Sequence, residues 1–294
     1  MWDGLKWLGH RGAILSSGRP YQNSLAAFEW AMAVADGFES DACVSRDGRV
    51  FLIHEAKYAD PCRGVEYCAA EHLCHDSAEQ LGSRRIDEVD SAFLMGLRLK
   101  DGSPIPTLED ALALFAGRPN KLFNLEIKGA GAVDAVLPSL ASALREGRIA
   151  PSSLLLSSFN HEALSVVRRQ LPGVAVGALF VAPDQAPTRL FPWDPRLMAQ
   201  YLPLTPRHLA EPRLAALAPE VVVMPDCALS GENCRAVAAA LPGARVVAWV
   251  FTERQGEATG GLTQRFESGI PRDWLAGLIV DDPKVGVGPL GRQV

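Results

Sequence analysis

The chain has 294 residues, of which 48% are hydrophobic and 21% are charged, and its formal net charge is −5. This composition excludes global disorder, and the acidic balance argues against a general nucleic-acid-binding protein, which usually presents a basic face. No run approaches the roughly 18 consecutive apolar residues of a transmembrane helix, and the first residues lack the features of a secretory leader, so we expect a cytoplasmic protein.

Apolar runs of strand length alternate with helical patterns along the chain. The predicted strands are 6–9, 37–44, 50–54, 121–127, 154–158, 174–180, 221–224, 246–251 and 278–281. The predicted helices are 24–35, 108–115, 132–145, 161–170, 209–217, 231–241 and 261–268. About eight strand–helix units favour an α/β protein with a parallel sheet closed into a single (β/α)8 TIM barrel. One barrel of about 250 residues with an insertion fits this length.

Two segments interrupt this alternation. We expect one domain over residues 1–294 with an insertion at about 55–103, and a proline-rich loop at 181–206 over one end of the barrel. The insertion concentrates several possible metal or disulfide ligands, namely Cys62, Cys68, His72, Cys74 and His75. Their spacing matches no common Cys-x-x-Cys zinc motif. A zinc site and a disulfide therefore stay open, while free thiols are favoured.

Acidic side chains occur near the ends of two predicted strands. Glu39 and Asp41 alternate along one strand, as do Glu126 and Lys128 along another, so each pair faces one side. In a barrel, inward-facing residues at the carboxyl ends of the strands border the active-site mouth. Carboxylates that meet there repel one another unless a cation lies among them, and Mg2+ and Ca2+ prefer oxygen ligands. The pattern therefore predicts one divalent cation, Mg2+ or Ca2+.

Two histidines follow predicted strands and complete a site suited to phosphate chemistry. His10 and Arg11 come directly after the first strand, and His54 ends the apolar run that begins at residue 50. Imidazoles exchange protons near neutral pH, while a metal ion with Arg11 and Lys128 neutralises a phosphodiester. We therefore expect a small-molecule phosphodiester as the binding partner.

An ordered series of motifs carries a family resemblance. The series comprises His-Arg-Gly at 10–12, Asn-Ser-Leu-Ala-Ala-Phe at 23–28, Gly-Phe-Glu-Ser-Asp at 37–41, Ser-Arg-Asp-Gly-Arg-Val-Phe-Leu-Ile-His-Glu at 45–55, Ile-Pro-Thr-Leu-Glu-Asp-Ala-Leu at 105–112, Asn-Leu-Glu-Ile-Lys at 124–128, Ser-Ser-Phe-Asn at 157–160, Val-Ala-Trp at 247–249 and Gly-Leu-Ile-Val-Asp-Asp-Pro at 277–283. This order resembles the glycerophosphodiester phosphodiesterase family over most of the chain. Each motif is weak alone, but the ordered set is specific.

The resemblance implies a TIM barrel that hydrolyses a glycerophosphodiester-like substrate to a phosphomonoester, such as glycerol 3-phosphate, and an alcohol. It implies roles for the residues singled out above: metal ligands Glu39, Asp41 and Glu126, general acid and base His10 and His54, and substrate-binding residues Arg11, Lys128 and Trp249. Which histidine protonates the leaving alcohol, and whether water or a substrate hydroxyl attacks, stay open.

Two departures from the family pattern widen the range of functions. Gln22 stands where the family usually has glutamate, which replaces a carboxylate near Arg11 with an uncharged amide. The stretch after His54 also differs from the usual family sequence. An opine-type sugar phosphodiester is therefore an alternative substrate, and a phosphodiester lyase or transferase is an alternative activity. A non-catalytic binding barrel is the least favoured interpretation.

Overall fold

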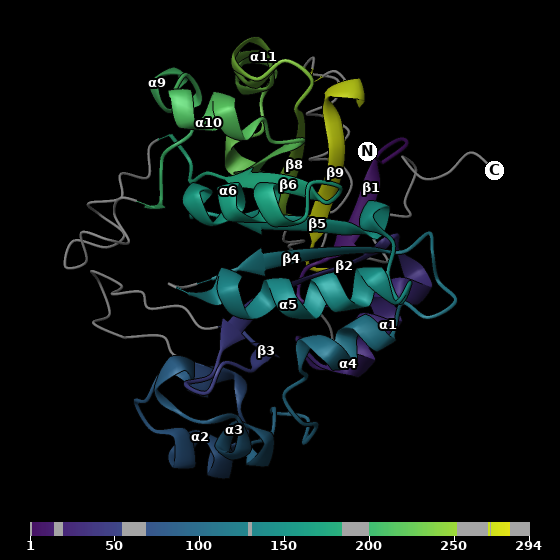
Figure 1. The fold of residues 1–294 in the computed structure, drawn as a ribbon, viewed down its shortest axis with the longest axis vertical. Coiled ribbons are helices and arrows are strands. Elements are labelled where there is room, and N and C mark those ends of the chain that lie inside the picture. The colour runs from purple at the N-terminus through teal and green to yellow at the C-terminus, as the bar shows by residue number, and fades with distance from the viewer. Residues whose placement is uncertain are drawn as a thin grey trace, which may run out of the picture.

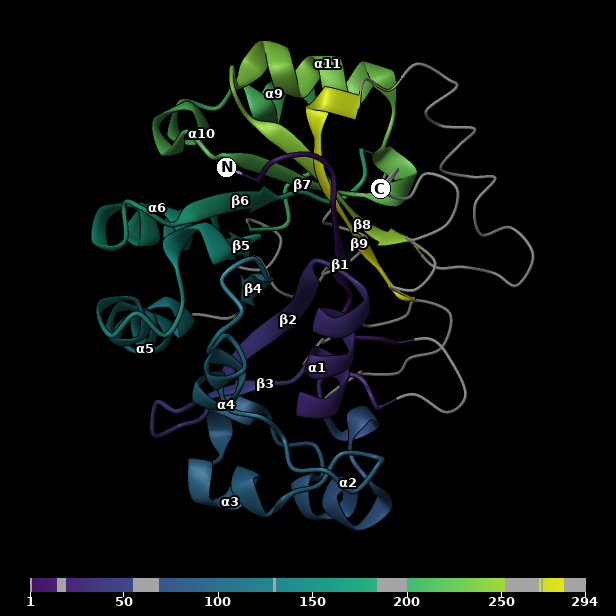
Figure 2. The same cartoon turned by 90° about the vertical axis from the view of Figure 1, so that its right-hand side faces the viewer.

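Eight parallel strands close into a barrel, as predicted (Figures 1 and 2). The computed structural model describes residues 2–14, 20–54, 69–128, 131–183, 200–251, 270 and 272–282. The barrel strands are β1 (Lys6–Gly9), β2 (Gly37–Val44), β4 (Leu122–Ile127), β5 (Leu154–Ser158), β6 (Ala175–Leu179), β7 (Val221–Pro225), β8 (Arg245–Phe251) and β9 (Leu275–Val280). The barrel is closed because β1 pairs in parallel with both β2 and β9.

Helices cover the outside of the barrel between successive strands (Figure 1). They are α1 (Leu25–Val34), α4 (Leu108–Ala113), α5 (Ala132–Arg145), α6 (His161–Gln170), α9 (Pro206–Leu209), α10 (Pro212–Leu217) and α11 (Gly231–Ala240), with short η3 (Pro151–Ser153), η4 (Asp226–Ala228) and η5 (Arg272–Trp274) turns. Two helices begin with a hydroxyl cap: Ser24 accepts from the Ala27 amide, and Thr107 accepts from the Asp110 amide. These caps satisfy amide groups that a helix start leaves unpaired.

Alternation along β2 and β4 separates an outer core from the barrel interior. Phe38 and Phe123 point outward and pack with tilted rings, their centroids 4.6 Å apart, beneath the helices. The residues that alternate with these phenylalanines along each strand, such as Glu39 and Asp41 on β2, face inward. The register pairs Asp41 with Glu126 across the two strands. Gly37 lets β2 approach β4, since a Cβ there would lie 1.9 Å from the Leu122 carbonyl oxygen. The two acidic strand ends are therefore held side by side.

The predicted strand at 50–54 is present in a shortened form but lies outside the barrel. β3 (Val50–Leu52) pairs antiparallel with the end of β2 as a hairpin. The insertion follows it and contains η1 (Ala69–His72), α2 (His75–Leu81), η2 (Ile86–Glu88) and α3 (Ser91–Gly96). Phe51 and Ile53 pack into a separate apolar cluster with insertion residues such as Leu81 and Leu94. Figures 1 and 2 show this unit at the edge of the barrel below β2 and β3.

One prediction of a continuous helix was wrong. The segment 209–217 was expected to be one helix, but α9 ends at Leu209 and α10 begins at Pro212. Proline lacks an amide proton and disfavours a helical residue before it, so Glu211 is extended and the helix restarts. The helix expected at 261–268 and residues 184–199 of the proline-rich loop lie outside the described residues. Within the described parts of the chain, no helix is both long and apolar enough to cross a bilayer.

Candidate functional site

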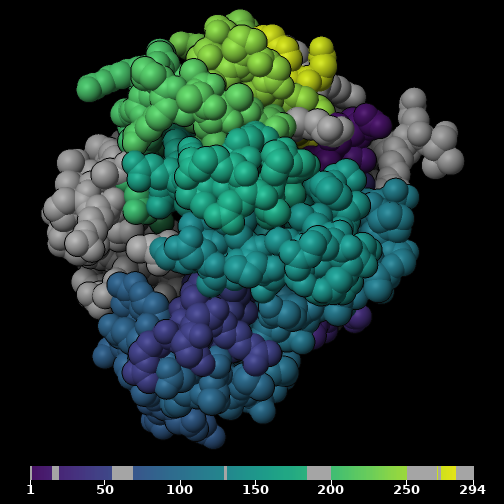
Figure 3. Space-filling view, viewed as in Figure 1, coloured from purple at the N-terminus to yellow at the C-terminus, as the bar shows by residue number. Residues whose placement is uncertain are grey.

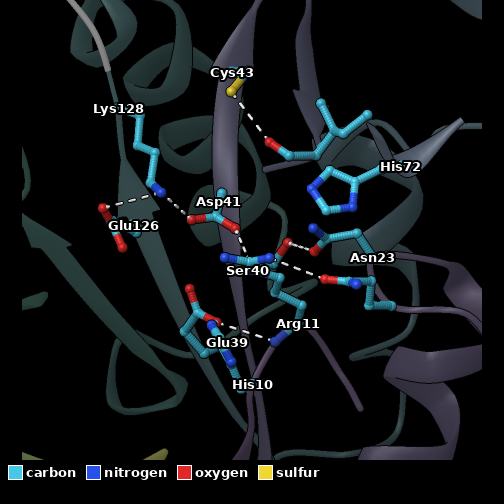
Figure 4. A network of polar contacts seen from close by, with 12 residues as sticks. His10, Arg11, Asn23, Glu39, Ser40, Asp41, Cys43, His72, Glu126 and Lys128 are labelled. Carbon is cyan, nitrogen blue, oxygen red and sulfur yellow. Dashed lines mark hydrogen bonds and ion pairs between the residues drawn. The ribbon is translucent and has the colours of Figure 1, made fainter. Parts of the chain in front are cut away.

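Three carboxylates meet inside the carboxyl end of the barrel (Figure 4). Glu39 and Asp41 come from β2, and Glu126 comes from the end of β4. One oxygen from each lies within 4.8 Å of the others. Glu39 and Asp41 are nearly inaccessible, with 4% and 2% of their surface exposed. The structure therefore brings together the three residues that the sequence singled out as metal ligands.

The electrostatics of these carboxylates show that the group is short of positive charge. Burial, followed by repulsion from Asp41 and Glu126, raises the pKa of Glu39 well above its usual value. Burial likewise raises the pKa of Glu126 to about 7, although Lys128 opposes the shift. Oδ2 of Asp41 is buried and accepts no hydrogen bond from the described residues. Such a set fits a hard divalent cation, because oxygen ligands that repel one another are stabilised by an ion between them.

Arg11 and Lys128 place two cations beside the carboxylates. Lys128 Nζ lies 2.6 Å from Oδ1 of Asp41 and 3.6 Å from Oε1 of Glu126. Arg11 Nε lies 3.3 Å from Oδ2 of Asp41. Burial alone would raise the pKa of Asp41, but Lys128 with His54 and Arg11 outweighs it and lowers that pKa. Asp41 is therefore held ionised next to two carboxyl groups whose pKa values are raised.

A turn after β1 aims Arg11 into the site. Arg11 and Asn23 both have positive φ, at 49° and 55°, and the Asn23 amide donates to the Arg11 carbonyl oxygen at 2.8 Å. Asn23 Oδ1 also accepts from Ser40 on β2 at 2.7 Å. Gln22 Oε1 accepts from Arg11 Nη1 at 3.0 Å, so the amide at this position still supports the guanidinium. Strained backbone of this kind persists where surrounding contacts determine it.

His10 is oriented by a carboxylate that was not among the predicted site residues. Its Nδ1 lies 2.7 Å from Oδ1 of Asp281, which follows β9, and its Nε2 lies 4.0 Å from Oε2 of Glu39. Burial, then the charge of Arg11, lowers the pKa of His10, while Asp281 opposes that shift. The pairing of a strand-end aspartate with a histidine 271 positions earlier requires barrel closure, which local sequence does not reveal.

His54 lies two residues after β3 and is buried near the same charges. Burial, then Lys128, lowers its pKa well below the ordinary value, and Asp41 opposes the shift. Two insertion residues approach it: the rings of His54 and His72 meet edge-on with centroids 5.9 Å apart, and Glu71 Oε1 lies 3.1 Å from His72 Nε2. No local sequence pattern joins His72 to His54. Cys74 is a free thiol, whereas Cys62 and Cys68 lie outside the described residues.

An aromatic group borders the mouth beside these charges. Trp249 on β8 meets Phe159 edge-on at 6.1 Å, and Tyr201 stacks on Phe159 at 4.2 Å. Nε1 of Trp249 is buried without a hydrogen-bond partner among the described residues. Tyr201 is among the groups that raise the pKa of Lys128, which places the two side chains close together. A substrate-binding role for Trp249 stays a prediction.

The fold and the site together define a parallel (β/α)8 barrel whose mouth holds three carboxylates, two cations and two histidines. The chain belongs to the glycerophosphoryl diester phosphodiesterase family, whose model matches residues 10–257. It is 28% identical over 175 residues to the glycerophosphodiester phosphodiesterase of Caldanaerobacter subterraneus, which covers 59% of this chain. The chain spans less than two thirds of the length of this curated relative, 65%. The family resemblance of the motifs is thereby confirmed.

Solved structures show the same fold at low sequence identity. A glycerophosphoryl diester phosphodiesterase structure from Silicibacter pomeroyi is 18% identical, with a TM-score of 0.68, and the match covers 96% of this chain and 91% of that one. A phosphodiesterase from Oleispira antarctica is 20% identical, with a TM-score of 0.62 and coverage of 96% and 94%. The latter structure is a complex with the product sn-glycerol-3-phosphate. At these identities the likeness concerns the fold.

Proposed function

We propose that this chain hydrolyses a glycerophosphodiester to glycerol 3-phosphate and a free alcohol, with the help of one divalent cation. The observation that carries the proposal is the meeting of Glu39, Asp41 and Glu126 within 4.8 Å, beside Arg11 and Lys128. Family membership and the named activity of the relatives support it. An anionic phosphodiester is the ligand class that such a mixed set of acids and bases accepts once a cation is bound.

The three carboxylates are the proposed ligands of the cation, Mg2+ or Ca2+. When bound, that ion neutralises phosphate charge and favours an anionic oxygen nucleophile. Arg11 and Lys128 hold the non-bridging phosphate oxygens through hydrogen bonds assisted by charge. Both cations already pair with Asp41, so the phosphate enters a pocket whose donors are fixed before it arrives. The donors therefore need little reorganisation when charge develops on the phosphate.

His10 is the proposed general base. Asp281 engages its Nδ1 at 2.7 Å, which leaves Nε2 directed at the carboxylate group, 4.0 Å from Glu39. A carboxylate that holds Nδ1–H fixes the tautomer in which Nε2 accepts a proton, and it stabilises the imidazolium that forms. His10 then removes a proton from the attacking water as a new P–O bond forms.

His54 is the proposed general acid. It lies on the hairpin side of the site, so it does not share the Asp281 contact that suits His10 to be the base. The pKa of His54 is lowered by burial and then by Lys128, and the anionic phosphodiester counteracts that positive charge when it binds. His54 in its imidazolium form gives a proton to the alcohol oxygen as the bond between that oxygen and phosphorus breaks.

Product analysis in 18O-labelled water tests the reaction. We expect purified protein with Mg2+ or Ca2+ to convert glycerophosphodiesters to glycerol 3-phosphate that carries one 18O, seen as an isotope shift in the 31P NMR spectrum. Unlabelled monoester or a cyclic phosphate as the end product would contradict direct hydrolysis. No turnover of glycerophosphodiesters, with turnover of sugar phosphodiesters, would contradict the substrate class while leaving the chemistry intact.

A further inference from the structure

A second set of metal-type ligands lies beside the carboxylates, where the insertion meets the barrel. His54 follows the β3 hairpin, while Glu71 and His72 come from η1 of the insertion. The three residues each offer one ligand atom within 4.8 Å of the others. Figure 4 shows His72 across Asp41 from Glu126 and Lys128. The set joins two parts of the chain that are remote in sequence.

The imidazole nitrogens in this set have unmet bonding capacity. Nδ1 of His54 is buried and has no hydrogen-bond partner among the described residues. Nε2 of His72 is also buried and makes no aligned hydrogen bond there, although the Glu71 carboxylate lies 3.1 Å from it. The two residues are 7% and 5% exposed, so bulk water does not satisfy these atoms. A buried polar group without a partner costs about 1–3 kcal/mol, which makes the unpaired Nδ1 of His54 in this set unusual. An ion shared between the two nitrogens would remove the cost.

Glu71 completes a set of donors typical of zinc. Its Oε1 lies 3.1 Å from Nε2 of His72, and its side chain is 38% exposed, which gives an ion a path from solvent. Two imidazoles and one glutamate, with a further position open, form a common zinc site, whereas Mg2+ and Ca2+ prefer oxygen ligands alone. Zinc bonds of about 2.0–2.1 Å place ligand atoms roughly 3.4 Å apart. Glu71 and His72 are already near this spacing at 3.1 Å, and the whole set, which lies within 4.8 Å, needs to contract by at most about 1.4 Å.

We propose that His54, Glu71 and His72 bind a Zn2+ ion at a site distinct from the carboxylates, and that this ion inhibits the enzyme. The inhibitory part rests on the proposed function of His54 as general acid. An imidazole acts as a general acid when both ring nitrogens carry protons. A nitrogen lone pair given to zinc cannot also bind a proton, so zinc-bound His54 cannot form the imidazolium, and the N–H that stays on its other nitrogen is too weak an acid to protonate the leaving alcohol. Through the ion, Glu71 and His72 of the insertion thus control whether His54 acts as general acid.

Zinc titration of the full chain tests the site. Isothermal titration calorimetry is performed with Mg2+ in excess, so that the carboxylates are already filled. We expect one zinc ion per chain, bound about 100-fold more weakly by His72→Gln, in line with the loss of a metal-binding contact. His75→Gln is the matched control, since His75 is exposed and pairs with Glu79 four residues further on. Equal affinity in the wild type and His72→Gln would overturn the site.

Further variants secure the result against misfolding and against a different ion position. Glu71→Gln changes a partly exposed side chain, so it serves if His72→Gln fails to fold, and we expect it to weaken zinc binding about tenfold. Glu126→Gln removes a carboxylate ligand of the other site. Zinc affinity unchanged in Glu126→Gln supports the separate site, whereas its loss in that variant would place zinc among the carboxylates and overturn the proposal.

The inhibition is measured for each variant against its own zinc-free hydrolysis rate. We expect the wild type and His75→Gln to lose activity over the zinc concentrations that fill the site, and His72→Gln to require about 100-fold more zinc. Zinc binding that leaves the rate unchanged would overturn the inhibitory role. If the chain hydrolyses no glycerophosphodiester, the proposed function fails, but calorimetry still decides whether the zinc site exists.

Discussion

Lys128 Nζ lies 2.6 Å from Oδ1 of Asp41, whose side chain is almost fully enclosed, while that of Lys128 is 18% exposed. Burial disfavours the charge on Lys128, but Asp41 and Glu126 outweigh burial and raise the pKa of Lys128 well above its ordinary value. The pair is therefore ionised, and each charge depends on the other. Removing one partner of such a buried ion pair is strongly destabilising, because the other charge stays buried without compensation.

Lys128→Met is expected to reduce kcat/KM about 100-fold, since the phosphate loses a preorganised cation. Because Asp41 then keeps a buried negative charge with less compensation, the metal-free variant should lose about 3–5 kcal/mol of unfolding free energy. Urea denaturation with and without Mg2+ measures this loss. Arg148→Met is the control, since Arg148 forms an ion pair with Glu146 at the surface. Equal effects of the two substitutions would contradict a special role for the buried pair.

Metal binding should stabilise the protein more as the pH rises. The pKa of Glu126 is raised to about 7 and that of Glu39 is raised well above its usual value, mainly by burial. Each contributes stability that is present below its unfolded pKa and is lost as the pH rises through its folded pKa. The metal-free melting temperature should therefore fall between about pH 4.5 and pH 7, whereas bound cation offsets the repulsion.

Thermal melts with a chelator and with Mg2+ or Ca2+ measure this difference. At 100 times the dissociation constant, an ion adds about 2.7 kcal/mol, or roughly 5–10 °C in a chain of this size. Glu126→Gln should lose most of the metal shift and part of the pH dependence. Glu79→Gln, which changes an exposed carboxylate of the insertion, should keep both. Identical metal shifts at pH 5 and pH 8 would argue against ligation by these carboxylates.

Asp281→Asn tests how His10 is oriented. Asp281 raises the pKa of His10 through a hydrogen bond and its charge, so its removal should lower that pKa further. The acidic limb of the kcat/KM profile should move to lower pH, and the maximum should fall about 100-fold or more because the tautomer is no longer fixed. Asp273→Asn, a change at an exposed position of η5, should leave the profile unchanged. A lower maximum without any shift of the limb would indicate a structural role alone.

The barrel was predictable because its signals are local. The strand predicted at 37–44 and that at 154–158 match β2 and β5, since each is an apolar run bounded by turns and helix caps. Alternation then placed Glu39 and Asp41 on one face. Local periodicity could not show that 50–54 forms a hairpin edge, because a short apolar run looks alike in parallel and antiparallel sheets.

The parts of the site that sequence did not predict depend on contacts between distant segments. Asp281 reaches His10 after the last strand closes against the first, and His72 reaches His54 after the insertion packs on the hairpin. Neither partner has a distinctive spacing along the chain. Gln22 was expected to weaken the support of Arg11, yet its amide oxygen accepts the hydrogen bond that a carboxylate would accept. The neutral amide thus keeps the hydrogen bond to Arg11 but carries no negative charge.

His10 and His54 should differ in how far a good leaving group restores activity. Each alanine variant should lose about 100-fold or more in turnover of a glycerophosphodiester with an alkyl alcohol. p-Nitrophenolate leaves phosphorus without being protonated, so a p-nitrophenyl ester substrate should restore most of the rate in His54→Ala. It should restore little in His10→Ala, because water still has to be deprotonated. Steady-state rates on the two esters measure the contrast, with His208→Ala, at the start of α9, as the control. Restoration in His10→Ala instead would exchange the two roles, and equal restoration in both variants would mean that neither histidine acts on the leaving group alone.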